Sequence, residues 1–185
     1  METDKRILLA NRPLDTTATA TIQVVLWDRE RSKICLVLDK GGVKERNGGS
    51  YEKPRGWGNV AGKVRVGETP YEAAIRETEE ESNHMRKTFR VRQIPVDVRT
   101  SYGNRAAHDK PHHKIVFVGE VIDPGEPLES MEVRDPSSGI LQRAWVPFSE
   151  LPGMLEAEDP TFVFRGEHIY TSHLSYIYTT RSEML

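Results

Sequence analysis

Three glutamates follow one arginine at spacings that could hold a divalent metal ion. Arg76, Glu77, Glu80 and Glu81 lie in one short run of the sequence. At about 100° per residue in a helix, Glu77 and Glu81 lie one above the other and Glu80 lies beside them. Like charges at this spacing repel by roughly a few tenths of a kcal/mol, so the helix itself gains nothing from the pattern. A hard cation such as Mg²⁺ or Mn²⁺ would relieve that repulsion, whereas the alternative is a solvated acidic face.

The residues before this run predict the start of the helix that carries it. Thr69 suits the N-cap, Pro70 the first helical position, and Glu72 the third position of a capping box. Asn83 tolerates the left-handed conformation and is the predicted end. The residues expected on the opposite, core-facing side are Tyr71, Ile75, Thr78 and Ser82.

Residues 62–84 resemble the signature of the Nudix hydrolase family. That signature is a glycine, a glutamate, and then Arg-Glu-aliphatic-x-Glu-Glu-x-Gly-aliphatic at fixed spacings. The positions that match are Gly62, Glu68, Arg76, Glu77, Glu80 and Glu81, and those that depart are Thr78, Asn83 and His84. No departure removes a carboxylate, although Thr78 and His84 are expected to weaken the packing of the helix.

The resemblance implies a fold, a reaction and a role for each matching residue. The fold is α/β, a Nudix-type α/β/α sandwich with a mixed β-sheet, here one domain over residues 1–185. The reaction is hydrolysis, by water, of a diphosphate in a nucleoside diphosphate linked to another group. Metal ligands would come from the Gly62 carbonyl and from Glu77, Glu80 and Glu81. Arg76 would orient a glutamate, or be an ordinary surface arginine, and Glu68 would support the network or shift a proton.

Family members often add one carboxylate from a later loop. The residues that could supply it as a ligand or general base are Glu126, Glu129 and Glu132, and the sequence does not choose among them.

Two basic segments flank the signature and are the predicted substrate-binding regions. Residues 39–58 form a glycine-rich cationic loop that either embraces a phosphate chain or is solvated surface. Residues 99–114 combine histidines with basic residues, and a zinc site there is disfavoured because no cysteine accompanies them. The candidate substrate-binding residues are Lys53, Arg55, Tyr102, Arg105, His112 and His113. In the Nudix family, diadenosine polyphosphate hydrolases tend to carry a tyrosine soon after the signature, and Tyr102 is similar to it in position. The resemblance therefore weakly favours dinucleoside polyphosphate or nucleoside triphosphate substrates.

Composition narrows the setting and the partners. The chain has 185 residues, 37% of them hydrophobic, and a net charge of −2, which suits one compact domain and gives no general attraction to nucleic acid. The single cysteine, Cys35, is expected in a buried strand, and a reducing cytoplasm is predicted. No apolar run reaches membrane-spanning length. The expected partner is a nucleotide-type small molecule, with an RNA 5′ end and a homodimer left open.

Segments rich in β-branched and aromatic residues surround the acidic helix. The predicted strands are 17–28, 33–39, 88–102, 114–122 and 141–146, the first two joined as a hairpin by residues 29–32. Ser149 is expected to cap a short helical turn over 150–155, and residues 166–180 are predicted to form a C-terminal helix.

Two other functions remain open at this point. A Nudix-fold domain could bind a nucleotide without turning it over, but such domains usually lose a signature glutamate, and all are retained here. Isomerase chemistry on a diphosphate ester has no positive support in the sequence. Hydrolysis is therefore the favoured prediction.

Overall fold

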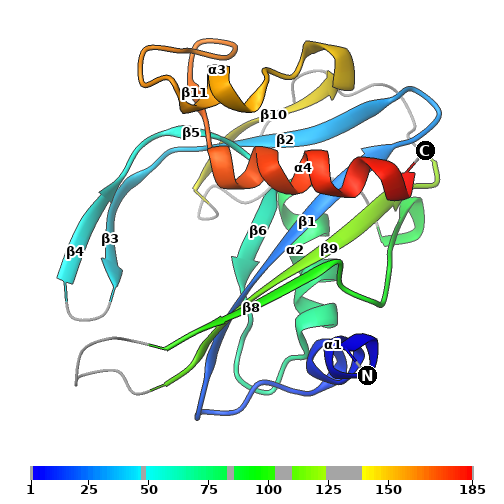
Figure 1. Cartoon of the computed structure of the whole chain (residues 1–185). Helices are drawn as coiled ribbons and strands as arrows, with labels where there is room; N and C mark the ends of the chain where they lie inside the picture. The colour runs from blue at the N-terminus through cyan, green and yellow to red at the C-terminus, as the bar shows by residue number, and fades with distance from the viewer. Residues whose placement is uncertain (1, 47–48, 83–85, 103–109, 124–138, 185) are drawn as a thin grey trace.

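The computed structural model describes residues 2–46, 49–82, 86–102, 110–123 and 139–184. Its largest feature is a nine-stranded mixed sheet with helices on both faces (Figure 1). In chain order the elements are α1 (Glu2–Asn11), β1 (Thr19–Asp28), β2 (Lys33–Asp39), β3 (Gly42–Arg46), β4 (Gly49–Lys53), β5 (Gly56–Gly58), β6 (Val60–Lys63), α2 (Pro70–Ser82), η1 (Arg86–Thr88), β7 (Phe89–Val91), β8 (Asp97–Ser101), β9 (His112–Val121), β10 (Ile140–Pro147), η3 (Phe148–Glu150), α3 (Met154–Glu158), β11 (His168–Ile169) and α4 (Thr171–Met184).

Apolar side chains alternate along the central strands, and each set packs under different helices. On β1, Ile22 and Val24 belong to the core shared with α1 and α2, whereas Val25 and Trp27 belong to the core shared with α3 and α4. Because successive side chains of a strand point to opposite faces, one sheet supports both cores. The predicted α/β/α sandwich with a mixed sheet is therefore confirmed.

The strands β1 and β2 pair only where they leave their hairpin and then separate. Their register is Trp27 with Ile34 and Asp28 with Lys33. Farther along, β1 pairs with β6 and β2 pairs with β5, both antiparallel. Residues 56–63 thus lie between the two diverging strands. This arrangement brings Gly62, the first residue of the signature, to the middle of the sheet.

The helix α2 begins as the sequence predicted. The Thr69 backbone N–H donates to the Glu72 carboxylate at 2.9 Å, and the Glu72 N–H donates to the Thr69 hydroxyl at 3.1 Å, so the capping box is complete. Thr78 is fully buried rather than a weak point, because its hydroxyl donates to the Ala74 carbonyl at 2.7 Å. Asn83 and His84 lie outside the described residues.

Residues 39–58 were predicted to form a cationic loop, and this prediction of their secondary structure was wrong. The segment forms the two-stranded ribbon β3–β4, followed by β5. Gly41 and Gly42 have φ values of +69° and +102°, and this left-handed backbone redirects the chain from β2 into the ribbon. Lys44, Arg46 and Lys53 are therefore carried by strands, whereas Lys40 and Arg55 lie in the connections between strands.

Three other predicted boundaries also differ. The strand expected over 88–102 is split into β7 and β8, because Pro95 between them has no N–H to donate to a sheet. The helix expected from residue 166 begins at Thr171, after a turn in which Gly166 has a φ of +86°. The turn expected over 150–155 is instead η3, followed by α3, which Gly153 caps.

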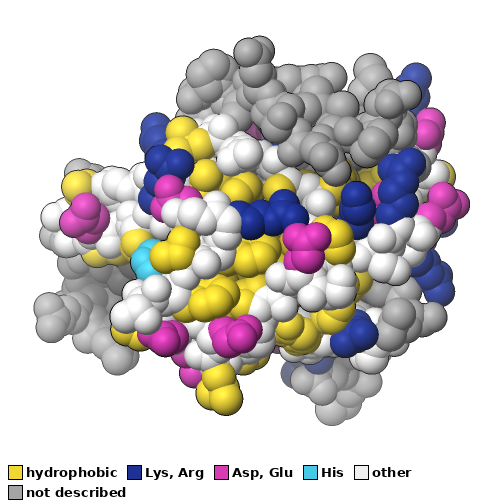
Figure 2. Space-filling view, turned by 90° about the horizontal axis from the view of Figure 1, so that it is seen from above, with side chains coloured by type: hydrophobic (Ala, Val, Ile, Leu, Met, Phe, Trp, Pro, Cys, Tyr) yellow, Lys and Arg dark blue, Asp and Glu magenta, His cyan; other side chains and the backbone are white. Residues whose placement is uncertain are grey.

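The first helix of the chain was not predicted from the sequence. The N-terminal helix α1 packs beside α2 through Leu9 and Ala10. None of the described helices combines the length and apolar character needed to cross a bilayer. On the face shown in Figure 2, basic and acidic side chains are interspersed around apolar ones.

The capping box gives a first prediction. Thr69→Ala should lower the free energy of unfolding by about 1 kcal/mol, because the first turn of α2 loses its side-chain acceptor. Urea denaturation measures this, with Thr69→Ser as the control that keeps the hydroxyl. Equal stability of the alanine and serine variants would contradict the assigned role.

Candidate functional site

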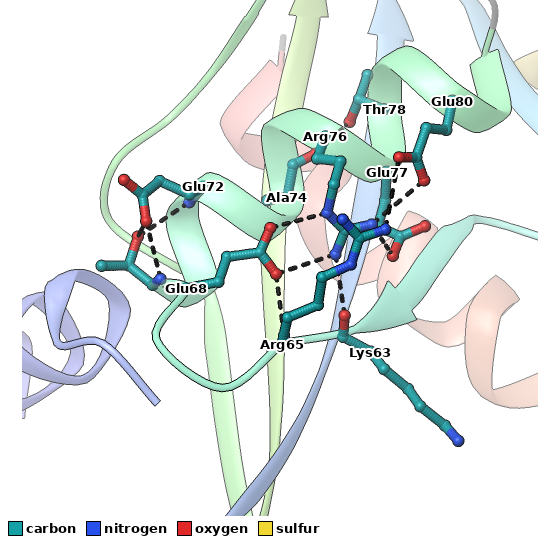
Figure 3. Close-up of polar contacts among 10 residues, drawn as sticks. Lys63, Arg65, Glu68, Glu72, Ala74, Arg76, Glu77, Thr78 and Glu80 are labelled. Atoms are coloured by element: carbon teal, nitrogen blue, oxygen red, sulfur yellow. Dashed lines mark hydrogen bonds and ion pairs between the residues drawn. The ribbon is translucent and has the colours of Figure 1, made fainter. Parts of the chain in front are cut away.

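The Arg76 side chain organises the acidic face of α2 (Figure 3). Its guanidinium donates to both carboxylate oxygens of Glu68, at 2.8 and 3.0 Å. The same group reaches Glu77 at 2.5 Å and Glu80 at 3.2 Å. It also donates to the Lys63 carbonyl at 3.0 Å. One cation therefore compensates three carboxylates and ties α2 to the end of β6.

Glu68 is the bidentate partner of Arg76, a more central place than its predicted supporting role suggested. The Arg65 backbone N–H also donates to its carboxylate, at 2.9 Å. Burial alone would raise the pKa of Glu68, but the hydrogen bonds from Arg76 and Arg65 outweigh it and hold that pKa below its usual value. In turn, the Glu68 carboxylate raises the pKa of Arg76. The pair stays fully ionised.

Gly62 is needed at its position because the Glu77 carboxyl group occupies the space beside it. A Cβ atom at residue 62 would lie 1.9 Å from the Glu77 carboxyl carbon, so any other residue here would displace this carboxyl group. The absence of a side chain at Gly62 thus leaves room for the Glu77 carboxylate between α2 and β6. Burial raises the pKa of Glu77, although Arg76 opposes that shift.

Glu81 is the most buried of the three signature glutamates on α2, with 5% of its surface exposed. The Ala61 backbone N–H donates to it at 2.9 Å. Burial nevertheless raises the pKa of Glu81 to about 8, and the nearby charges of Glu77 and Asp39 add to this. The carboxylate is held in a position where its negative charge lacks sufficient compensation.

The carboxylates of the acidic face fit a divalent cation by chemistry. Mg²⁺ and Mn²⁺ prefer oxygen donors, and a cation would stabilise the ionised forms of Glu77 and Glu81, which burial disfavours. In the part of the chain described, no three carboxylate, histidine or cysteine side chains already converge tightly enough to enclose a metal. Glu77 and Glu80 are instead turned toward Arg76.

Arg143 on β10 is a site residue that the sequence analysis missed. Only 3% of its surface is exposed, and its guanidinium donates to the backbone carbonyls of Glu81 and, at 3.4 Å, of Glu80. These carbonyls belong to the last turn of α2, where the helix dipole favours a cation. A lone arginine among apolar strand residues was the only signal, and its partners lie some sixty residues earlier in the chain.

His173 on α4 forms a second buried polar group near the site, also missed from sequence. Its Nδ1 accepts the Asn59 backbone N–H at 2.9 Å, so the ring proton is on Nε2. That nitrogen lies 2.8 Å from the Gln23 amide group. The Gln23 side-chain oxygen must therefore face the ring, which also gives a partner to an oxygen otherwise without one among the described residues.

The basic residues predicted to bind substrate lie in different places. Lys53 pairs with Asp39 at 2.5 Å and lies 4.7 Å from the centre of the Tyr170 ring, within the electrostatic surroundings of Glu81. Arg55 pairs with Glu167 at 2.7 Å. The Tyr102 side chain, 73% exposed, follows the end of β8.

The two predicted histidines of the second basic segment do not share a face. They are neighbours on β9, and strand geometry sends them to opposite sides of the sheet. His112 contacts the hydroxyls of Thr19 and Thr21, at 2.9 and 3.2 Å, whereas His113 contacts Thr100 at 2.9 Å. Burial lowers the pKa of His113. Arg105, Glu126, Glu129 and Glu132 lie outside the described residues.

A mixed α/β/α sandwich with an arginine-organised acidic helix defines the class of Nudix-type pyrophosphohydrolases. The family model named NUDIX domain matches residues 17–166, which is most of the chain. The chain belongs to the Nudix family. No curated protein matches it significantly in sequence.

Solved structures agree with this fold at low identity. A NUDIX hydrolase from Nitrosomonas europaea has a TM-score of 0.51 at 18% identity, over 90% of each chain. A bifunctional NMN adenylyltransferase/ADP ribose pyrophosphatase from Francisella tularensis has 0.52 at 14% identity, over 100% of this chain and 46% of that one. The NUDIX domain of Shewanella oneidensis NrtR has 0.50 at 13% identity, over 96% and 97%.

Arg143 provides a prediction about the end of α2. In Arg143→Lys the ammonium cannot contact both carbonyls as the guanidinium does, so the amides of residues 79–82 should exchange with solvent about ten- to a hundredfold faster. Hydrogen-exchange mass spectrometry or NMR measures this. Arg165→Lys, at a surface pair with Glu150, is the control and should leave those amides unchanged.

His173 provides a prediction about pH. Burial lowers its pKa to about 3, below the ordinary 6.5, so the folded protein binds fewer protons than the unfolded chain between these values. Stability from this group is present above pH 6.5 and is lost as pH falls toward 3, at up to about 1.4 kcal/mol per pH unit. An NMR titration should show a neutral His173 ring at pH 5, and His173→Gln should flatten the acid limb of the stability profile.

The exposed His168 provides the control for that experiment. His168→Gln should keep the acid limb of the wild type. A His173 ring that protonates near pH 6.5 would contradict the buried neutral state.

Proposed function

We propose that this protein hydrolyses a diphosphate linkage in a nucleotide derivative, with Mg²⁺ or Mn²⁺ as its metal. The observation that carries the proposal is the set of carboxylates on α2, Glu77, Glu80 and Glu81, gathered beside Gly62 and organised by Arg76. All the signature glutamates are present, which favours turnover over binding alone.

Ligands of the similar structures support a nucleotide and a divalent metal. The Francisella tularensis protein is complexed with AMP and a Mn ion, and the Shewanella oneidensis domain with ADP ribose. Both ligands contain an adenosine phosphate. On this chain we take them as support for a nucleotide derivative, with dinucleoside polyphosphates and nucleoside triphosphates as the first substrates to test.

Each residue of the acidic face has a proposed part in this reaction. Glu77, Glu80 and Glu81 would hold the cation, together with the Gly62 carbonyl. When bound, the cation would neutralise phosphate charge and acidify a water molecule. Glu68 keeps Arg76 in place, and Arg76 keeps Glu77 and Glu80 beside each other without allowing their charges to repel freely. Lys53, paired with Asp39 near Glu81, would contact a phosphate oxygen of the substrate.

The buried thiol also fits the predicted location. Cys35 is fully enclosed and burial raises its pKa to about 12, so it is neither a nucleophile nor a disulfide partner within the chain. A reducing cytoplasm remains our proposal for where the protein works.

Removal of a single carboxylate tests the reaction. Glu77→Gln, Glu80→Gln and Glu81→Gln should each lower kcat at least about a hundredfold, because even partners outside the metal shell cost ten- to a hundredfold when lost. The matched control is Glu79→Gln, in the same acidic run but not at a signature position. Its kcat should stay within about threefold of the wild type.

A substrate screen completes the test. Dinucleoside polyphosphates, nucleoside triphosphates, capped RNA and nucleotide sugars would be incubated with Mg²⁺ or Mn²⁺ and the products identified by mass. Wild-type rates in the glutamine variants would refute the proposed ligands. Tight nucleotide binding without turnover of any compound would favour the binding-domain alternative.

A further inference from the structure

One row of side chains crosses four adjacent strands on the face of the sheet that α4 covers. The strand registers place Thr21 of β1 opposite Lys63 of β6 and opposite Lys114 of β9, and Lys114 opposite Arg99 of β8. Directly paired residues project from the same face. With strands about 4.8 Å apart, the row from Lys63 to Arg99 extends about 14 Å. It contains three cations and one hydroxyl.

The far end of this row concentrates positive charge around an aromatic ring. The Lys114 ammonium lies 5.1 Å from the centre of the Tyr176 ring, and the Arg99 guanidinium carbon lies 5.3 Å from it. Asp97 compensates Arg99 at 2.8 Å. Burial lowers the pKa of Lys114, and the like charge of Arg99 lowers it further. Two neighbouring cations on one ring are therefore in a position that an anion would stabilise.

Hydroxyl and imidazole groups border the row. Thr19 and Thr21 contact the two nitrogens of His112, which lies on the same face as Lys114. Two residues after Thr21 on the same strand, Gln23 contacts His173 of α4. The surroundings thus offer hydrogen-bond donors as well as charge, and phosphate oxygens accept from both.

The near end of the row adjoins the acidic site. Lys63 follows Gly62, and its carbonyl accepts from Arg76, while its side chain extends away from the carboxylates (Figure 3). Gly62 lies against Glu77 on the face of the sheet that α2 covers. Because neighbouring residues of a strand point to opposite faces, the Lys63 side chain lies on the face that α4 covers. His173 lies within the electrostatic reach of both Lys53 and Lys114. Lys53, which also affects the pKa of Glu81, and Lys114, beside Tyr176, therefore both act on the His173 ring.

We propose that the row Lys63, Thr21, Lys114 and Arg99 is an anion subsite that holds phosphate groups lying beyond the diphosphate that is cleaved. The inference rests on the proposed function and narrows its substrate class. It selects compounds whose phosphate chain is longer than a diphosphate, such as dinucleoside polyphosphates or nucleoside triphosphates, over nucleotide sugars. A purely structural role explains the row less well, because Asp97 offsets the repulsion between Lys114 and Arg99 only in part.

The first experiment measures binding without the reaction. Inorganic tripolyphosphate would be titrated into the full chain by calorimetry in EDTA, so that no metal-dependent site contributes. Lys114→Gln and Arg99→Gln should each weaken binding about tenfold, the effect of one lost charge-assisted hydrogen bond. Lys114→Arg keeps the charge and should bind within about threefold of the wild type. Arg90→Gln, on β7 and away from the row, is the matched control.

The second experiment compares substrates of different phosphate number. In Lys114→Gln the KM for a dinucleoside polyphosphate or a nucleoside triphosphate should rise about tenfold, whereas the KM for a nucleotide sugar and kcat for both should change little. Circular dichroism and the melting temperature confirm that each variant is folded.

The two experiments fail independently. No tripolyphosphate binding by the wild type, or equal binding by all variants, overturns the subsite whatever the enzyme hydrolyses. An equal rise in KM for both substrate types overturns the selectivity for long phosphate chains. Binding that follows the predicted order while no compound is hydrolysed supports the subsite and refutes the proposed hydrolysis instead.

Discussion

The arrangement of the site depends on how the charge of its carboxylates is compensated. Glu68, Glu77 and Glu80 would repel one another on and beside a single helix, and Arg76 contacts all three. These contacts hold the carboxylates together, and the Arg76 contact with the Lys63 carbonyl joins α2 to the end of β6. Glu81 receives no hydrogen bond from Arg76 and is held by a backbone N–H, so its buried charge is the one that most needs a cation.

The sheet provides the rigid support for this arrangement. Divergence of β1 and β2 opens a place for residues 56–63, and the absence of a side chain at Gly62 lets the Glu77 carboxyl group come close. Arg143 reaches the end of α2 from β10, so the acidic helix is fixed at its end as well as along its face. Arg76 neutralises carboxylates and also binds the Lys63 carbonyl, whereas Arg143 binds the backbone carbonyls at the end of the helix.

The sequence predicted most of what is local. The capping box of α2 was correct because Thr69 and Glu72 contact each other across three residues. The strand over 33–39 was correct because its apolar run is continuous. The basic segment after β2 was predicted as a loop and forms a ribbon instead. Thr78 is on the core-facing side as predicted, but its hydroxyl bonds within its own helix, so it does not weaken the packing there. Arg143, His173 and the row ending at Arg99 have partners far away in the chain, so no local pattern indicates them.

By itself, the sequence determined the family, the acidic helix and the identity of the carboxylates, because these depend on residue types at short, regular spacings. Only the tertiary structure decided how those carboxylates are compensated and which basic residues share a face. His112 and His113 are adjacent in sequence but lie on opposite sides of the sheet, whereas Lys63, Lys114 and Arg99 are distant in sequence but form one row. The physical reason is strand pairing, since the register between strands sets which side chains meet and is itself fixed by burial of both faces of the sheet.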